Sequence, residues 1–237
     1  MAELKKFIRE EARTLPIILL LDRSGSMCGE NIDTLNDAVK IMIKDFADET
    51  GMTCEIKVAI VSFGGMHASV DVPLTSAIEI AYAPLLADGM TPLGDALKKA
   101  KELIEDRSII TPRSYRPVVI LASDGLPNDA WEEIFEKFIS EGRTKKCERW
   151  ALAIGNGCDE QMLQKFVGKD SEKLFRAQDA GHIKQFFRMV TMSTVTKTKS
   201  QNPNLSVNIS DMNELVGDPE FLAFLENDGI KNDNENK

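Results

Sequence analysis

The feature that most constrains the fold of this chain is an apolar run that ends abruptly in polar residues. Residues Leu15–Leu21 contain no polar side chain, and Asp22, Ser24 and Ser26 follow directly. The run is too short to cross a bilayer, which needs about 20 residues. Its aliphatic composition is typical of a strand buried on both faces of a parallel sheet. Ligands of open α/β sheets bind beyond the carboxyl ends of the strands, so the three polar residues lie where a ligand is expected.

The rest of the chain alternates between apolar strands and amphipathic helices. Strands are predicted at 15–22, 54–63, 68–72, 116–125, 149–155 and 173–176, and helices at 29–50, 91–107, 130–141, 159–167 and 179–194. The third strand is short, and we expect it to lie antiparallel at an edge and to end at Pro73. This order predicts an α/β protein with a doubly wound, mostly parallel six-stranded sheet flanked by helices, which is a Rossmann-like architecture.

Three regions differ in character along the 237 residues. Residues 1–14 are charged and form a predicted N-terminal arm, and 15–194 form one domain. Residues 195–237 are a polar, acidic extension whose last residues have the composition of a disordered segment. Its apolar patch Phe221–Leu225 either docks on the domain as a helix or binds a partner. The acids of the extension could also supply a carboxylate to a metal in a neighbouring molecule.

Charge and cysteine content limit the possible partners and compartment. The net charge of −9 argues against binding to nucleic acid or to an anionic membrane surface, because both require a basic field. Neither a secretory leader nor an apolar run of membrane-spanning length is visible. The four cysteines are widely spaced without a Cys-x-x-Cys pair, so they are predicted to be reduced thiols of a cytoplasmic protein.

The polar residues after the first strand have the chemistry of a metal site. Alternate residues of an extended segment point the same way, so Asp22, Ser24 and Ser26 can converge on one point. Carboxylate and hydroxyl oxygens suit Mg²⁺ first, with Mn²⁺ and Ca²⁺ as alternatives. Thr91 precedes a helix and Asp124 ends another apolar strand, and both are expected at the same rim. The simpler interpretation is that all five are turn and capping residues.

Capping is expected of two of these loop residues in any case. Thr91 has the features of a helix N-cap because Pro92 follows it at the first helical position. Asp129 is in position to cap the helix predicted at 130–141.

This combination resembles the von Willebrand factor A domain family over about residues 14–194. The family's metal-ion-dependent adhesion site uses Asp-x-Ser-x-Ser, a distant Thr and a distant Asp, which here match Asp22, Ser24, Ser26, Thr91 and Asp124. The chain departs from the usual pattern at Arg23 and Ser123, and neither departure removes a ligand. The resemblance implies a Rossmann-like fold and a bound divalent cation whose free coordination position accepts an acidic side chain of a partner protein.

A narrower resemblance is to the TerY-like group encoded in tellurium-resistance-type operons of bacteria. It is carried by the stretches 15–30, 89–97 and 123–131. Such proteins often accompany a protein kinase and a metal-dependent phosphatase of the PP2C type. The resemblance therefore implies a signalling adaptor in a stress-resistance or defence system.

Three functions compete on the residues themselves. The first is a non-enzymatic, metal-dependent protein-binding module. The second is a phosphohydrolase with Asp22 as its nucleophile, but such enzymes carry an acid two residues later and this chain has Ser24. The third is nucleotide binding, which is disfavoured because neither Gly-x-x-x-x-Gly-Lys-[Ser/Thr] nor Gly-x-Gly-x-x-Gly follows the first strand.

Overall fold

The computed structural model describes residues 12–51, 54–200 and 204, and these form a three-layer α/β domain. Six strands make one sheet in the order β3-β2-β1-β4-β5-β6. The strands are β1 (Arg13–Asp22), β2 (Cys54–Gly64), β3 (His67–Ser76), β4 (Val118–Ser123), β5 (Glu148–Ile154) and β6 (Leu174–Ala177). All neighbours pair in parallel except β3, which is antiparallel to β2 at the edge of the sheet. The predicted fold class is confirmed.

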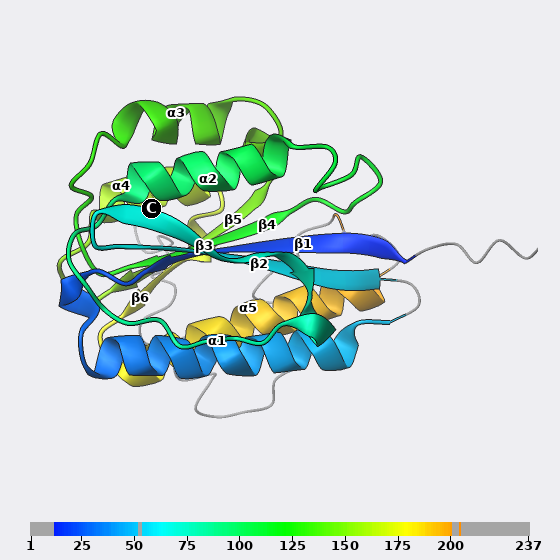
Figure 1. Ribbon diagram of the computed structural model, residues 1–237, viewed down its shortest axis with the longest axis horizontal. Helices are drawn as coiled ribbons and strands as arrows, with labels where there is room; N and C mark the ends of the chain where they lie inside the picture. Colours follow the sequence, from blue (N-terminus) through cyan, green and yellow to red (C-terminus); the bar gives the residue numbers. More distant parts are fainter. Residues whose placement is uncertain (1–11, 52–53, 201–203, 205–237) are drawn as a thin grey trace, which may run out of the picture.

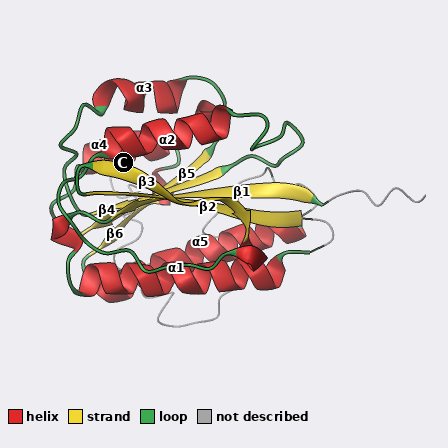
Figure 2. Ribbon diagram, viewed as in Figure 1, coloured by secondary structure: helices red, strands yellow, loops and turns green. Residues whose placement is uncertain are grey.

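Helices cover both faces of this sheet (Figures 1 and 2). The helices are α1 (Glu30–Glu49), α2 (Leu93–Glu105), α3 (Glu132–Ser140), α4 (Glu160–Val167) and α5 (Ala180–Lys199). Helices α1 and α5 pack side by side on one face, and α2, α3 and α4 lie on the other. None of the helices in the described part of the chain has the length and apolar character that a membrane crossing requires.

The uninterrupted apolar run of β1 follows from this sandwich. Leu19 and Leu21 belong to the core beneath α1 and α5, whereas Ile18 and Leu20 belong to the core beneath α2, α3 and α4. Successive side chains of a strand point to opposite faces. Because both faces are covered by helices, every position of the central strand has to be apolar.

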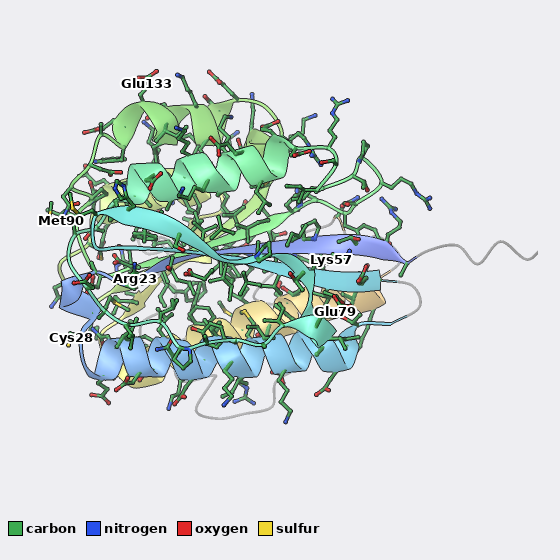
Figure 3. All side chains as sticks on the ribbon, viewed as in Figure 1. Arg23, Cys28, Lys57, Glu79, Met90 and Glu133 are labelled. Atoms are coloured by element: carbon green, nitrogen blue, oxygen red, sulfur yellow. The ribbon has the colours of Figure 1, made fainter. Side chains whose placement is uncertain are left out.

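The five parallel strands end at the same edge of the sheet, and the candidate site lies there. Figure 3 shows Arg23, Cys28 and Met90 gathered at this end of the molecule, while Lys57 and Glu79 lie toward the other end. Arg23 and Cys28 follow β1 directly, whereas Met90 comes from the loop that precedes α2. Segments far apart in sequence therefore meet at this rim.

Three of the differences from the predicted element boundaries concern strands β1 and β3 and helix α5. Strand β1 begins at Arg13, which pairs with Cys54, and α5 continues to Lys199. Pro73 does not end the third strand, because β3 runs through it to Ser76. The β2–β3 register shifts between Val58 and Ile60, so Pro73 lies at an irregularity of an edge strand. Proline is tolerated there because its missing N–H removes no ladder bond.

Other predictions concern residues at or beyond the described ends. Of the predicted arm at 1–14, residues 1–11 lie outside the described residues. Most of the extension at 195–237 also lies outside them, including Phe221–Leu225. All four cysteines fall in the described part, and each is a free thiol.

Candidate metal site

Asp22 is the buried carboxylate at the centre of the candidate site. It is the last residue of β1 and is fully buried. One carboxylate oxygen, Oδ1, accepts a hydrogen bond from the backbone N–H of Ser24 at 2.8 Å, and Oδ2 accepts one from the Ser123 hydroxyl at 2.5 Å. Burial raises its pKa to about 6, although the bonds from Ser123 and Ser24 act in the opposite direction. The two bonds therefore compensate the buried charge only in part, and a nearby cation would favour the ionised form.

Ser24, Ser26 and Asp124 form a connected group beside Asp22. The Ser26 hydroxyl donates to Asp124 Oδ1 at 2.8 Å, and the Ser24 hydroxyl approaches the same oxygen at 3.4 Å. The two serine oxygens lie 3.1 Å apart. Burial raises the pKa of Asp124 as well, with the serine bonds opposing the effect. The sequence separation of about 100 residues is bridged because β1 and β4 are neighbours in the sheet.

Thr91 reaches the same group from the loop before α2. A Cβ atom built on Gly125 would lie 3.5 Å from Thr91 Oγ1 and 3.9 Å from Ser26 Oγ. Both hydroxyls therefore surround the turn that follows Asp124, and a side chain at Gly125 would enter the space beside them. The structure thus brings together all five residues that the sequence singled out.

The expected capping roles of Thr91 and Asp129 are both wrong. Helix α2 begins at Leu93 after Pro92, and no side chain of its own N-cap bonds to it. Asp129 supplies the missing acceptors instead, because its two carboxylate oxygens accept from the N–H groups of Gly94 at 3.1 Å and Asp95 at 3.0 Å. Helix α3 starts later than predicted, at Glu132. Thr91 Oγ1 lies instead beside the turn that follows Asp124.

Asn128 fixes the backbone of Thr91. Its side-chain Oδ1 accepts from the Thr91 N–H at 3.0 Å, and its own N–H donates to the Thr91 carbonyl at 3.2 Å. The loop after β4 thus holds both Asp124 and the backbone that positions Thr91. Sequence reasoning missed this role of Asn128 and Asp129, since nothing local indicates that they bond to residues more than 30 positions away.

Arg23 anchors the loop that carries Thr91 from the other side. Its guanidinium donates to the Ser62 hydroxyl at 3.2 Å and to the Leu86 carbonyl at 3.3 Å. The Arg23 carbonyl accepts from the N–H of Asp88 at 2.8 Å. This residue, which departs from the family pattern, is therefore a positioning residue for the loop.

Two glycines allow the loop to approach the sheet. Gly65 and Gly89 form an isolated bridge, and the Gly25 N–H donates to the Gly89 carbonyl at 3.0 Å. Gly89 has a φ of 63°, and a Cβ atom on it would lie 2.6 Å from the Cα of Gly65. Only glycine fits this position without moving the backbone. The contact between Gly65 and Gly89 joins residues 24 positions apart and is a product of the fold.

The donor set fits a hard divalent cation. It consists of two carboxylates and three hydroxyls, which are the oxygen ligands preferred by Mg²⁺, Mn²⁺ and Ca²⁺. Within the described ranges, no group of three or more His, Cys, Asp or Glu side chains is placed to hold a metal ion. A site built from three or more such side chains is therefore not found in the described ranges, and the candidate site at the rim of β1 and β4 combines two acids with hydroxyls.

The chain matches the model of the von Willebrand factor type A domain over residues 17–189. No curated protein is similar enough in sequence to count as a match.

Three solved structures share the fold. Proximal thread matrix protein 1 from the mussel byssus, with a zinc-occupied MIDAS motif (a metal-ion-dependent adhesion site), is 18% identical with a TM-score of 0.58, and the match covers 76% of this chain and 45% of that one. A von Willebrand factor type A protein from Catenulispora acidiphila is 20% identical with a TM-score of 0.57, and the match covers 77% of this chain and 42% of that one. The pilus adhesin SpaC from Lactobacillus rhamnosus GG, in its open conformation, is 15% identical with a TM-score of 0.62. That match covers 78% of this chain and 30% of the adhesin. The chain thus spans less than half of these proteins, and at such identities the likeness shows the fold alone.

Proposed function

The chain belongs to the von Willebrand factor type A domain family, and on that premise we propose that it is a metal-dependent protein-binding module without enzymatic activity. The observation that carries the proposal is the convergence of five oxygen-bearing side chains on one rim of the sheet. Those side chains belong to Asp22, Ser24, Ser26, Thr91 and Asp124. Domains of this family commonly serve as interaction modules with a metal-ion-dependent adhesion site.

Mg²⁺ is the proposed ion, and the five residues would hold it. Mg²⁺ retains several waters and needs few direct protein ligands, which agrees with a set that contains only two acids. A metal with few anionic ligands keeps a strong attraction for further negative groups. The proposed ligand from outside is therefore an Asp or Glu side chain of a partner protein.

The proposed setting is a cytoplasmic signalling adaptor of a bacterial stress-resistance or defence system, of the TerY-like type. Its support is the resemblance of three sequence stretches, 15–30, 89–97 and 123–131, each of which contains candidate ligands at the rim. A protein kinase and a PP2C-type phosphatase are the partners that this resemblance suggests. The free state of all four cysteines is consistent with a reducing compartment.

The geometry around Asp22 supports a binding role over a phosphohydrolase role. A nucleophilic carboxylate needs access to substrate and a nearby proton donor. Asp22 is fully buried, both of its oxygens already accept hydrogen bonds, and the residue two positions later is Ser24. Hydrolysis of a generic phosphomonoester that is lost in Asp22→Asn would instead establish the enzyme.

Calorimetric titration with Mg²⁺ and Mn²⁺ tests the metal site. The wild type is expected to bind one ion, and Asp22→Ala and Thr91→Ala are expected to weaken binding by about tenfold or more, which is a loss of about 1.4 kcal/mol. Asp33→Ala is the matched control, because Asp33 is an exposed acid on the first turn of α1. Equal affinity of the wild type and Asp22→Ala would show that the site is misassigned.

A second titration tests the outside ligand. Short peptides that contain one Glu are expected to bind only when Mg²⁺ is present, and the same peptides with Gln are expected not to bind. Peptide binding that persists after chelation of the metal would contradict the proposed mode while leaving the metal site itself intact.

A further inference from the structure

One side of α5 is buried although no described helix lies over it. Gln185, Met189 and Ser193 are spaced by four residues and so form one stripe along the helix. Met189 is 0% exposed and Ser193 is 1% exposed. The opposite side of α5, with Lys184 and Phe187, borders the groove that separates it from α1. A stripe at the end of a helical layer would be open to solvent unless another segment covered it.

Met189 belongs to the core beneath α1 and α5, so the described elements cover the inner side of the stripe. The main contacts of α5 are with α1, β5 and β6. Strand β6 is the last strand of the sheet, and α1 and α5 are the helices on that face in the described residues (Figure 1). No described helix lies along the outer side of the stripe, which leaves that side to residues outside the described ranges.

Two polar atoms of the stripe are also buried. Gln185 Oε1 and Ser193 Oγ are buried and have no hydrogen-bond partner among the described residues. Buried polar atoms are nearly always paired in native proteins. Their burial beside Met189 shows that water is excluded from this side of α5.

The path of the chain after α5 leads to this side. Helix α5 ends at Lys199, and Asn204 Oδ1 then accepts a hydrogen bond from the backbone N–H of Arg116 at 2.8 Å. Arg116 lies just before β4, at the end of the sheet opposite the candidate metal site. The chain therefore passes the foot of β4, and residues 205–237 continue from there. The stripe from Ser193 to Gln185 is about 12 Å long at 1.5 Å per residue, well within the reach of this segment.

The extension contains one stretch with a matching pattern. In Asp218–Asp228, Asp218 and Pro219 form a helix start signal. Phe221, Leu222, Phe224 and Leu225 then fall on one face at helical spacing. Glu220, Glu226 and Asp228 give the stretch a negative charge.

We propose that residues 218–228 of the same chain dock along the stripe of α5 formed by Gln185, Met189 and Ser193, beside the edge strand β6. Phe221, Leu222, Phe224 and Leu225 provide the apolar contact. The acidic extension is then a fixed part of the domain, held on its side. It is not free to present a carboxylate to the metal of a neighbouring molecule.

Thiol labelling in the full-length chain tests the docking. Ser193→Cys places a thiol on the stripe, and Lys184→Cys places a matched thiol on the opposite, exposed side of the same helix. Each cysteine variant is made twice, once with the wild-type extension and once with Phe221→Ser and Phe224→Ser together. The rate of maleimide labelling of each new cysteine is measured by mass spectrometry of its peptide. Loss of the two phenylalanines is expected to speed labelling at position 193 by about tenfold or more, with little change at position 184.

Other outcomes identify other covers and overturn the proposal. The proposal is wrong if the thiol at position 193 is labelled at the same rate with and without the two phenylalanines. It is also wrong if removal of residues 1–11 exposes that thiol, because the N-terminal arm would then be the cover. Protection that fades on dilution would point to a second copy of the chain.

Hydrogen exchange of the wild-type chain provides a measurement that needs no variant. Backbone amides of 219–228 are expected to be protected. Exchange at the rate of an unstructured peptide would refute the docking whatever the variants show. Neither measurement depends on a bound metal, so the docking and the metal-dependent function fail independently.

Discussion

At the scale of single residues, the environment of Asp22 explains why a strand this apolar ends in an acid. The carboxylate is fully buried, and burial raises its pKa to about 6. Ser123 and Ser24 donate to its two oxygens and orient them. A buried carboxylate that is only partly compensated costs stability unless a cation joins it. The residue is therefore better explained by binding than by packing.

Ser123→Ala is expected to destabilise the metal-free protein at pH 7 by about 1–3 kcal/mol, because Asp22 Oδ2 loses its donor in a buried setting. Urea unfolding in the presence of a chelator measures this change. Ser171→Ala, at an exposed position, is the control and is expected to change the free energy of unfolding by less than about 0.5 kcal/mol. An effect of Ser123→Ala no larger than the control would contradict the importance of this bond.

Gly89 is the residue at which the loop of Thr91 meets the sheet. Gly89→Ala is expected to destabilise the protein and to weaken metal binding, because the new Cβ would lie 2.6 Å from the Cα of Gly65. Gly155→Ala is a matched control, since Gly155 has nearly the same φ of 65° but no atom within 4 Å of its Cβ position. Both variants carry the conformational cost of about 1 kcal/mol or more. Calorimetry and urea unfolding should show the further loss only in Gly89→Ala.

At the scale of elements, the start of α2 is held by a residue from another loop. Asp129 accepts hydrogen bonds from the N–H groups of Gly94 and Asp95, and its negative charge lies at the positive end of the helix dipole. The same loop contains Asp124, which is a candidate ligand, and Asn128, which holds the backbone of Thr91. The helix cap and these two groups therefore belong to one loop. A change in the cap should therefore alter the geometry of the candidate metal site.

Asp129→Ala is expected to lower stability by about 1–2 kcal/mol through loss of the cap, and to weaken Mg²⁺ binding without abolishing it. The free energy of unfolding and the titration described above measure the two effects. Glu132→Ala is the control, because Glu132 is an exposed acid on the first turn of α3. Should both variants lose metal affinity equally, the general negative charge of the loop and not the cap would be responsible.

At the scale of the whole molecule, a buried ion network joins the foot of the sheet to α5. Glu148 begins β5, and its carboxylate contacts Lys197 of α5 at 2.5 Å, Lys173 before β6 at 3.4 Å and Arg116 before β4 at 3.4 Å. The Trp150 indole N–H also donates to it at 2.9 Å. Burial by itself would raise the pKa of Glu148, but the three cations together hold it below the ordinary value of 4.5. The network thus links four elements that are remote in sequence.

This network predicts a dependence of stability on pH. A carboxyl group whose pKa is lower in the folded state contributes stability above its unfolded pKa of about 4.5, and that contribution is lost as the pH falls through the folded value. Glu148→Gln is expected to be less stable than the wild type by about 3–5 kcal/mol at pH 7, because Lys197 and Lys173 stay buried without their acid. Urea unfolding from pH 6 to pH 3 should show the difference shrinking below about pH 4.5. A difference that is constant over this range would contradict the role of Glu148.

The class of fold could be predicted from the sequence, and the five residues of the candidate site could be named from it. The apolar run ending at Asp22 is readable because a strand covered on both faces has no polar position, and acids or hydroxyls at strand ends stand out against it. Hydrophobic periodicity likewise predicted the helices, since burial on one face is a local property of the chain.

The groups that support the candidate site could not be predicted in this way, because they come from remote segments that meet when the fold forms. Thr91 was predicted to cap α2, but Asp129 performs that role from 35 residues away. Pro73 was predicted to end the third strand, but β3 continues through it to Ser76 at the edge of the sheet. The contact between Gly65 and Gly89, like the anchoring of the loop by Arg23, exists because parallel strands bring distant loops to one rim. Hydrogen bonds and close approaches between remote segments leave no periodic trace in the sequence, so the fold has to form before they can be identified.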